Sequence, residues 1–193
     1  MSFIDPKTKE VNCKIVYYGP AFSGKSANIR SLYQKMGKGK KIKILSVPQS
    51  QDKTIFFDFI PLSVGMVKDY KIRFHLYTVP GQPLYETSRR IILKGVDGIV
   101  FVADSQVARI EENLESLKSL ENNMVQLGAD LADFPMIFQY NKRDLTGIAP
   151  VSSLDPLLNT NRLPVFESIA TEGTGVLETM QAIAKLVLKE LKD

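Results

Sequence analysis

Apolar runs and amphipathic stretches alternate along the chain. Residues 13–18 and 98–104 are almost continuously apolar, as expected of strands that are covered on both faces of a sheet. Residues 111–127 place leucine or methionine every three or four positions, which predicts an amphipathic helix. Residues 135–141 predict a further buried strand, and residues 176–191 predict a closing helix. This order indicates an α/β domain with a mainly parallel sheet.

One pair of segments breaks the alternation. Residues 54–60 and 72–79 both resemble strands, and the connection between them contains Gly65 and is too short for a helix. Parallel neighbours need a long crossover, so this pair predicts an antiparallel hairpin. A short strand is expected at residues 42–46. No repeat, low-complexity segment or domain boundary interrupts the pattern, and we expect a single domain over residues 1–193.

The composition narrows the class of protein. The chain of 193 residues is 44% hydrophobic and 24% charged, which is typical of a soluble globular protein. Its formal net charge of +4 is mild, and its lysines do not lie along a face with exposed aromatic residues, so we expect no nucleic-acid partner. The single cysteine, Cys13, favours a reducing cytoplasm. No apolar run approaches the ~20 residues that span a membrane, and no lipidation motif is present. We therefore expect a cytoplasmic monomer without a direct membrane anchor.

Residues 19–26 carry the phosphate-loop (P-loop) pattern, which is a glycine, four residues and then glycine-lysine-serine. Gly19 and Gly24 permit backbone conformations in which successive N–H groups turn toward phosphate oxygens. Lys25 supplies a positive charge to the β- and γ-phosphates, and the Ser26 hydroxyl can ligate Mg²⁺. The helix that begins here adds its positive N-terminal end. The candidate phosphate-binding residues are Gly19, Ala21, Phe22, Ser23, Gly24, Lys25, Ser26 and Ala27.

The sequence on either side of this loop favours the phosphate-binding interpretation. The first apolar strand ends directly before it, and Ile29, Leu32, Tyr33 and Met36 follow it at helical spacing. A strand, a glycine loop and a helix are the arrangement that a phosphate cradle requires. A glycine-rich turn that matches the pattern by chance is the alternative, and the context disfavours it.

A second motif follows the strand at 135–141. Asn141, Lys142 and Asp144 form the asparagine-lysine-x-aspartate tetrad with Arg143 between them. A carboxylate in the place of Asp144 can accept both guanine N1–H and the exocyclic N2–H₂, and adenine offers neither donor there. A buried carboxylate would therefore reject ATP, because its charge would remain unpaired. Lys142 can pack its stem on the base, and Asn141 can tie this loop to the P-loop. The predicted ligands are GTP and GDP.

With these motifs in place, the whole chain resembles the Ras-like small GTPase superfamily and, within it, the MglA group of bacterial gliding-motility and polarity GTPases. The resemblance implies a P-loop NTPase of the Ras-like G-domain type, an α/β fold whose mostly parallel sheet has six strands or slightly more and is flanked by helices. It also implies Mg²⁺ as a cofactor. The residues that carry it lie at 1–4, 12–20, 56–59, 73–82, 93–98 and 139–145.

The resemblance assigns roles to further residues. Gln82, after Gly81, corresponds to the catalytic glutamine that orients the attacking water. Thr54 corresponds to the switch threonine that joins Ser26 in holding Mg²⁺. Ser168 and Ala170 correspond loosely to the last nucleotide loop, with the Ala170 amide near guanine O6.

This chain departs from the family pattern at three positions. Thr78 stands where most small GTPases carry an aspartate that holds Mg²⁺ through water, although threonine is typical of the MglA group; either Asp58 or Asp52 could compensate. Lys53 aligns with an arginine that can act as a built-in finger, and lysine lacks the planar fork that clamps γ-phosphate oxygens. Ala21 replaces a glycine and adds a methyl group beside the γ-phosphate. We therefore expect slow intrinsic hydrolysis.

The resemblance also implies partners. GTP and GDP would hold residues 47–55 and 80–90 differently, because only GTP offers a γ-phosphate to their backbone. An MglB-like (Roadblock-type) activating protein and polarity or motility effectors would recognise these segments, and such partners could recruit the protein to a cell pole. A GTP-dependent scaffold that barely hydrolyses GTP is the alternative function. A P-loop kinase or ATPase is a more distant one, disfavoured by the tetrad at 141–144.

Overall fold

The computed structural model describes residues 3–5, 8–36, 45–46, 58–67 and 69–190. Two short 3₁₀ turns, Pro83–Tyr85 and Val107–Arg109, precede helices in this part. The strands are β1 (Phe3–Asp5), β2 (Glu10–Tyr18), β3 (Leu45–Ser46), β4 (Asp58–Val67), β5 (Tyr70–Thr78), β6 (Gly98–Asp104), β7 (Met136–Asn141) and β8 (Val165–Ser168). The helices are α1 (Lys25–Met36), α2 (Glu86–Leu93), α3 (Ile110–Gln126), α4 (Val151–Leu158) and α5 (Val176–Glu190).

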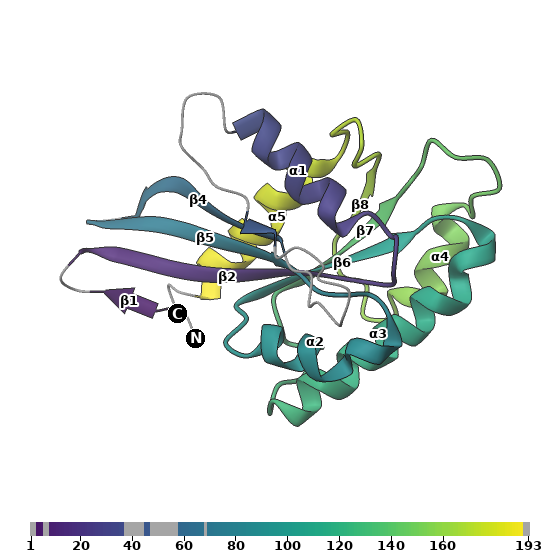
Figure 1. The fold of residues 1–193 in the computed structure, drawn as a ribbon, viewed down its shortest axis with the longest axis horizontal. Helices are drawn as coiled ribbons and strands as arrows, with labels where there is room; N and C mark the ends of the chain where they lie inside the picture. Colours follow the sequence, from purple (N-terminus) through teal and green to yellow (C-terminus); the bar gives the residue numbers. More distant parts are fainter. Residues whose placement is uncertain (1–2, 6–7, 37–44, 47–57, 68, 191–193) are drawn as a thin grey trace.

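One twisted sheet runs through the molecule in the order β3-β4-β5-β2-β6-β7-β8, and β1 pairs with β2 (Figure 1). The five strands from β5 to β8 in this order are parallel, whereas β4 is antiparallel to β5, and β3 to β4. The expected α/β class with a mostly parallel, slightly extended sheet is therefore confirmed. The parallel strands share one carboxyl edge, and the loops that leave this edge carry the predicted motifs.

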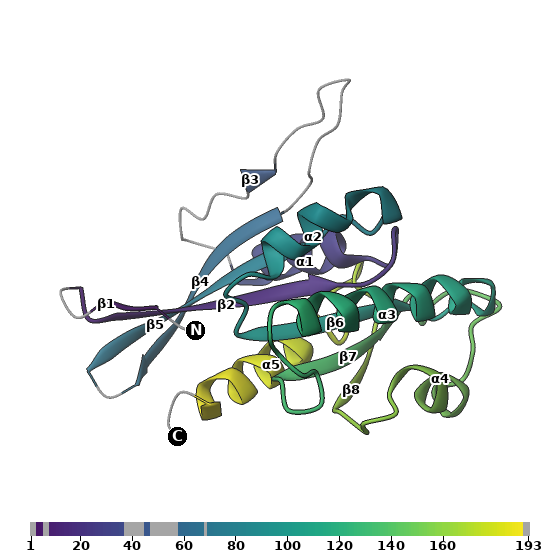
Figure 2. The ribbon, with the colours of Figure 1, turned by 90° about the horizontal axis from the view of Figure 1, so that it is seen from below.

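Helices cover both faces of the sheet (Figures 1 and 2), and alternate residues of the strands supply the two cores. Cys13, Ile15 and Tyr17 of β2 pack in one core with α1 and α5. Val16 and Tyr18 of the same strand pack in the other core with α2, α3 and α4. Every residue of β6 and β7 is buried, which explains why both strands are mostly apolar.

The antiparallel hairpin of β4 and β5 is confirmed, but its details differ from the prediction. We expected Gly65 in the connection, and this is wrong. Gly65 lies inside β4, where the pairing register with β5 shifts between Ser63 and Gly65. A glycine in a strand commonly marks such an irregularity. β4 is described from Asp58, four residues after the expected start at residue 54.

Within the described ranges, none of the helices combines the length and the apolar character that a membrane span requires.

Candidate functional site

The P-loop leaves the end of β2 in a conformation that depends on its two glycines. Gly19 has φ +137°, and a Cβ atom there would lie 2.2 Å from the carbonyl oxygen of Val102. Gly24 has φ +105°, and a Cβ atom there would lie 2.0 Å from Asn141 Nδ2. Side chains rarely adopt such φ values, and neither position has room for one. The loop therefore passes directly against β6 and the loop after β7.

Lys25 begins α1 and is buried, with 7% of its surface exposed. Its Nζ donates to the carbonyl oxygens of Gly19 at 2.9 Å and Pro20 at 2.6 Å. Burial lowers the pKa of Lys25 to about 7, and the positive charge of Arg89 contributes to this shift. A buried ammonium at the start of a helix is suited to an anion, which would favour its charged form.

Two neighbours in the P-loop are held in unusual environments. Phe22 has φ +64°, although it is bulky, and it is 81% exposed. Ser23 Oγ is buried and has no hydrogen-bond partner among the described residues. A cavity of about 250 Å³ opens here, and several of the predicted phosphate-binding residues line it. It is lined by Ala21, Phe22, Lys25 and Ser26 and, from across the site, by Thr78, Val79, Pro80, Gly81, Gln82 and Tyr85.

The predicted base side is joined to the P-loop through Asn141. Asn141 Nδ2 donates to the Ser23 carbonyl oxygen at 2.7 Å. Its Oδ1 accepts from Ser168 Oγ and from the Ala170 amide, each at 2.9 Å. The three loops that the sequence singled out therefore meet at one buried side chain. The Ala170 amide donates to Asn141, and its approach to guanine O6 stays a prediction.

Lys142 and Asp144 extend from the same loop. Lys142 has φ +66°, and its Nζ lies 2.6 Å from Oδ2 of the buried Asp104 at the end of β6. The side chain of Lys142 is thus anchored by its terminal ammonium group. The burial of Asp144 against guanine stays a prediction, and in this structure Asp144 is exposed. The reason is its place, which is three residues beyond the last buried position of β7, where the chain has already turned to the surface.

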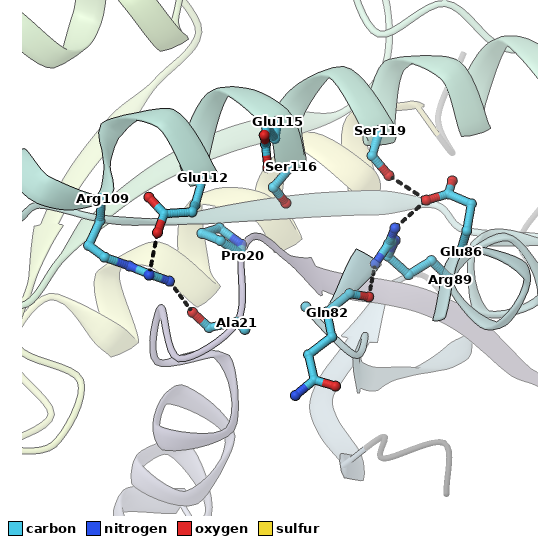
Figure 3. Close-up of a pocket in the computed structure, with 11 residues that line it drawn as sticks. Pro20, Ala21, Gln82, Glu86, Arg89, Arg109, Glu112, Glu115, Ser116 and Ser119 are labelled. Atoms are coloured by element: carbon cyan, nitrogen blue, oxygen red, sulfur yellow. Dashed lines mark hydrogen bonds and ion pairs between the residues drawn. The ribbon is translucent and has the colours of Figure 1, made fainter. Parts of the chain in front are cut away.

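Across the cavity, the segment after β5 lies against the P-loop. A Cβ atom on Gly81 would lie 2.2 Å from the Ala21 nitrogen, so the two backbones are in direct contact. Gln82 caps the 3₁₀ turn at 83–85 and is exposed. In Figure 3 its side-chain amide extends away from α3. Thr78 is buried at the end of β5 and lines the same cavity.

A second cavity, of about 270 Å³, lies between this segment, the P-loop and α3 (Figure 3). Arg89 of α2 is 5% exposed, and its Nη1 donates to the carbonyl oxygens of Gln82 at 2.6 Å and Pro80 at 3.3 Å. Its Nη2 pairs with Glu86. Glu86 in turn accepts from Ser119 Oγ at 3.0 Å and Asn123 Nδ2 at 2.5 Å, both on α3. Through Glu86, Arg89 thus ties the backbone around Gln82 to α3.

A second arginine lines the opposite side of this cavity. Arg109 Nη2 donates to the Ala21 carbonyl oxygen at 3.0 Å, and its Nη1 lies 2.5 Å from Glu112 Oε1. Its Nε lies 4.0 Å from Asp104 Oδ2. The P-loop and the Gln82 segment are therefore each held by an arginine that is anchored to α3.

Comparison with known proteins agrees with this geometry. The model of the ADP-ribosylation factor (Arf) family matches residues 12–187. The chain belongs to the Arf/Ras-like small GTPases. The GTPase is 50% identical over 192 residues to the Mutual gliding-motility protein MglA of Myxococcus xanthus (strain DK1622), which covers 100% of this chain and 98% of that protein. It is 25% identical over 185 residues to the Ras-related protein Rab-7a of Dictyostelium discoideum, covering 94% of this chain and 85% of that one.

The family binds guanine nucleotides with Mg²⁺ and hydrolyses GTP, and this GTPase is therefore a GTP-binding protein of the hydrolase class. Its residues fit such ligands. The glycine cradle and the buried Lys25 suit phosphate oxygens. The Ser26 and Thr78 hydroxyls both line the 250 Å³ cavity. Among the described residues, no cluster of three or more His, Cys, Asp or Glu side chains is placed to hold a metal ion.

Several predicted residues of the GTPase lie outside the described residues, namely Lys53, Thr54 and Asp52. Asp58 begins β4, and only its backbone is described. Their roles stay predictions.

Sequence reasoning missed Arg89, Arg109 and Asp104. A weak signal was present for two of them. Asp104 ends a buried strand at the carboxyl edge of the sheet, and Arg109 follows within one turn of the next helix, where side chains reach the site. Arg89 carried no such signal, because its role depends on how α2 packs against α3.

Proposed function

We propose that this GTPase is a GTP-dependent switch of the MglA type that regulates cell polarity or gliding motility through effectors that bind its GTP state. The three bonds of Asn141 carry the nucleotide part of the proposal, since they fix the phosphate loop and both base loops relative to one another. The 50% identity to an MglA over its full length supports the cellular part. We further propose that residues 1–193 act as one monomeric G domain.

In the proposed reaction, Lys25 and the P-loop amides of residues 21–27 bind the β- and γ-phosphates, and Asp144 and Lys142 bind the guanine. Gln82 orients the attacking water in line with the γ-phosphate. Mg²⁺, held by Ser26 and Thr54, neutralises charge on the phosphates when bound. Gln82 lines the 250 Å³ cavity together with Lys25 and Ser26, which supports this role.

We propose that hydrolysis is slow without a partner. Lys53 supplies a charge without the fork of an arginine, and Ala21 adds a methyl group where the backbone of Gly81 already makes direct contact. An MglB-like (Roadblock-type) protein is the proposed activator. It would act on residues 47–55 and 80–90, and partners would bring the protein from the cytoplasm to a pole.

A scaffold that binds GTP with little hydrolysis is the second candidate. Ala21 and Lys53 favour it, and the presence of Gln82 opposes it.

A multiple-turnover GTPase assay, with and without an MglB-like protein, tests the proposal. We expect tight binding of GTP and GDP over ATP, slow turnover of the protein by itself and a large acceleration by the partner. Turnover that stays at the rate of a Gln82→Leu variant under both conditions would favour the scaffold. Equal affinity for ATP and GTP would contradict both candidates.

A further inference from the structure

Arg109 lies where the first turn of α3 meets the P-loop, and its guanidinium is fixed from several sides. Asp104 Oδ2 lies 4.0 Å from its Nε. That carboxylate is itself immobile, because its side chain is 1% exposed, binds Lys142 Nζ at 2.6 Å and accepts from the Gln106 amide at 3.1 Å. Glu112 pairs with the other edge of the guanidinium. The Arg109 guanidinium, whose Nη2 donates to the P-loop, is therefore held in place by Asp104 at the end of β6.

The acceptor of that donor is the Ala21 carbonyl oxygen, at 3.0 Å. The peptide between Ala21 and Phe22 is planar and trans, so its C=O and N–H groups point in opposite directions. When Arg109 holds the oxygen on the α3 side, the Phe22 N–H points to the other side of the loop. The two cavities lie on these two sides, since Ala21 lines both, Arg109 lines only the 270 Å³ cavity, and Phe22 lines only the 250 Å³ cavity.

The conformation of Phe22 opposes this arrangement. At φ +64° its Cβ is crowded against the backbone, and bulky residues avoid this region. A flip of the Ala21–Phe22 peptide would move Phe22 to negative φ and relieve the crowding. The same flip would turn the N–H out of the phosphate cavity and break the bond from Arg109. The intrinsic preference of Phe22 and the bond from Arg109 therefore act in opposite directions on one peptide.

We propose that Arg109 is a positioning residue for the nucleotide: it prevents the flip of the Ala21–Phe22 peptide and so keeps the Phe22 N–H directed at the phosphates. The ligand is the β/γ-phosphate group of GTP or the β-phosphate of GDP, and the inference rests on the proposed function. Arg109 itself does not touch the nucleotide. It acts by preorganising the Phe22 N–H as a hydrogen-bond donor to the phosphates.

A double-mutant cycle tests this mechanism. GDP release is measured with a fluorescent GDP for the parent, Arg109→Ala, Phe22→Gly and the double variant. We expect Arg109→Ala to accelerate release about tenfold, the scale of a lost hydrogen bond to a charged group. Glycine adopts positive φ without crowding, so in the Phe22→Gly background the same substitution should change release by only about twofold. The amide proton of Phe22 in the GDP complex should shift upfield in Arg109→Ala and remain in place in the control Lys118→Ala, an exposed position on α3.

Two results would overturn the inference. Release that is accelerated equally in both backgrounds would mean that Arg109 acts through charge or general stability and not through the peptide. Release within twofold of the parent in Arg109→Ala would mean that the peptide holds its orientation without the arginine. If Arg109→Ala does not fold, Arg109→Lys replaces it in the cycle, since lysine keeps the charge but loses the fork. GDP binding by the parent is measured first. If the parent binds no GDP, the proposed function is contradicted. If the parent binds GDP but Arg109→Ala releases it at the parent's rate, only this inference is contradicted.

Discussion

The two halves of the site are built differently. On the base side, one neutral amide, Asn141, satisfies three backbone or hydroxyl groups and is itself buried. On the phosphate side, Arg109 and Arg89 hold the carbonyl oxygens of Ala21 and Gln82, and each arginine is paired with a carboxylate. The base side is compact and local to the loop ends of the sheet, whereas the phosphate side depends on long side chains that reach across a cavity.

This difference matters for a switch. Short buried amide bonds leave few alternatives, so the base side is suited to hold the nucleotide in every state. We therefore expect substitutions of Asp144 and Asn141 on the base side to change affinity or stability, and substitution of Arg89 on the phosphate side to change turnover.

The largest effect is expected for the residue that reads the base. Asp144→Ala should lower the affinity for GTP about 1000-fold and remove the preference over ATP, because two guanine donors lose their acceptor. Fluorescent nucleotide titration measures both affinities. Asp133→Ala, an exposed aspartate on another loop, is the control. A variant that still prefers GTP would show that another group reads the base.

Asn141→Ala should affect both affinity and folding. It leaves the Ser23 carbonyl, Ser168 hydroxyl and Ala170 amide without their partner, and we expect the free energy of unfolding to fall by about 3 kcal/mol. Urea denaturation without nucleotide measures this loss. Asn122→Ala, at an exposed position of α3, should change it by less than about 0.5 kcal/mol. Equal losses in the two variants would contradict the central role of Asn141.

Arg89→Lys addresses the phosphate side. Lysine cannot reach the carbonyl oxygens of Pro80 and Gln82 and also pair with Glu86 in one plane, so the segment around Gln82 should lose its fixed position. We expect single-turnover hydrolysis to fall about tenfold while GDP affinity stays within about threefold. The exposed Arg30→Lys is the matched substitution on α1. A loss of affinity without a loss of turnover would reverse the comparison between the two halves.

The pKa of Lys25 gives a smaller effect that depends on pH. Burial lowers this pKa to about 7, so above pH 7 the free folded protein holds a neutral amine, and bound phosphates would favour its protonation. GDP binding at pH 8.5 should take up close to one proton, and binding at pH 6 almost none. Calorimetry in buffers of different ionisation enthalpy measures the uptake. The same lowered pKa means that stability without nucleotide should rise with pH above 7, because only the unfolded chain stays protonated there. Binding without proton uptake at pH 8.5 would show that Lys25 is already charged in the free protein.

The smallest effect is expected at Ala21. Ala21→Gly removes one methyl group beside the contact with Gly81, and we expect intrinsic hydrolysis to rise about threefold, roughly 0.7 kcal/mol in the barrier. A single-turnover GTPase assay compares it with the parent. No acceleration would exclude the methyl group as the cause of slow turnover and leave Lys53 as the remaining candidate.

The elements and motifs that depend on neighbours along the chain could be predicted from the sequence. The P-loop glycines, the tetrad at 141–144 and the apolar strands could be read directly, because backbone conformation and strand burial impose short-range patterns. The hairpin of β4 and β5 was predictable for the same reason, but the place of Gly65 was not, since a register shift depends on the partner strand.

The hydrogen bonds that hold the phosphate side became visible in the tertiary structure alone. Arg109 and Ala21 are 88 positions apart, and Asn123 and Glu86 are 37 apart, and no local pattern marks either pair. The tetrad does not show that Asp144 is exposed, because burial depends on what surrounds a loop and not on its motif. A motif shows which chemical groups are available. The packing of α2 and α3 against the sheet determines which of them are held in place, because a hydrogen bond acts over about 3 Å regardless of the distance in sequence.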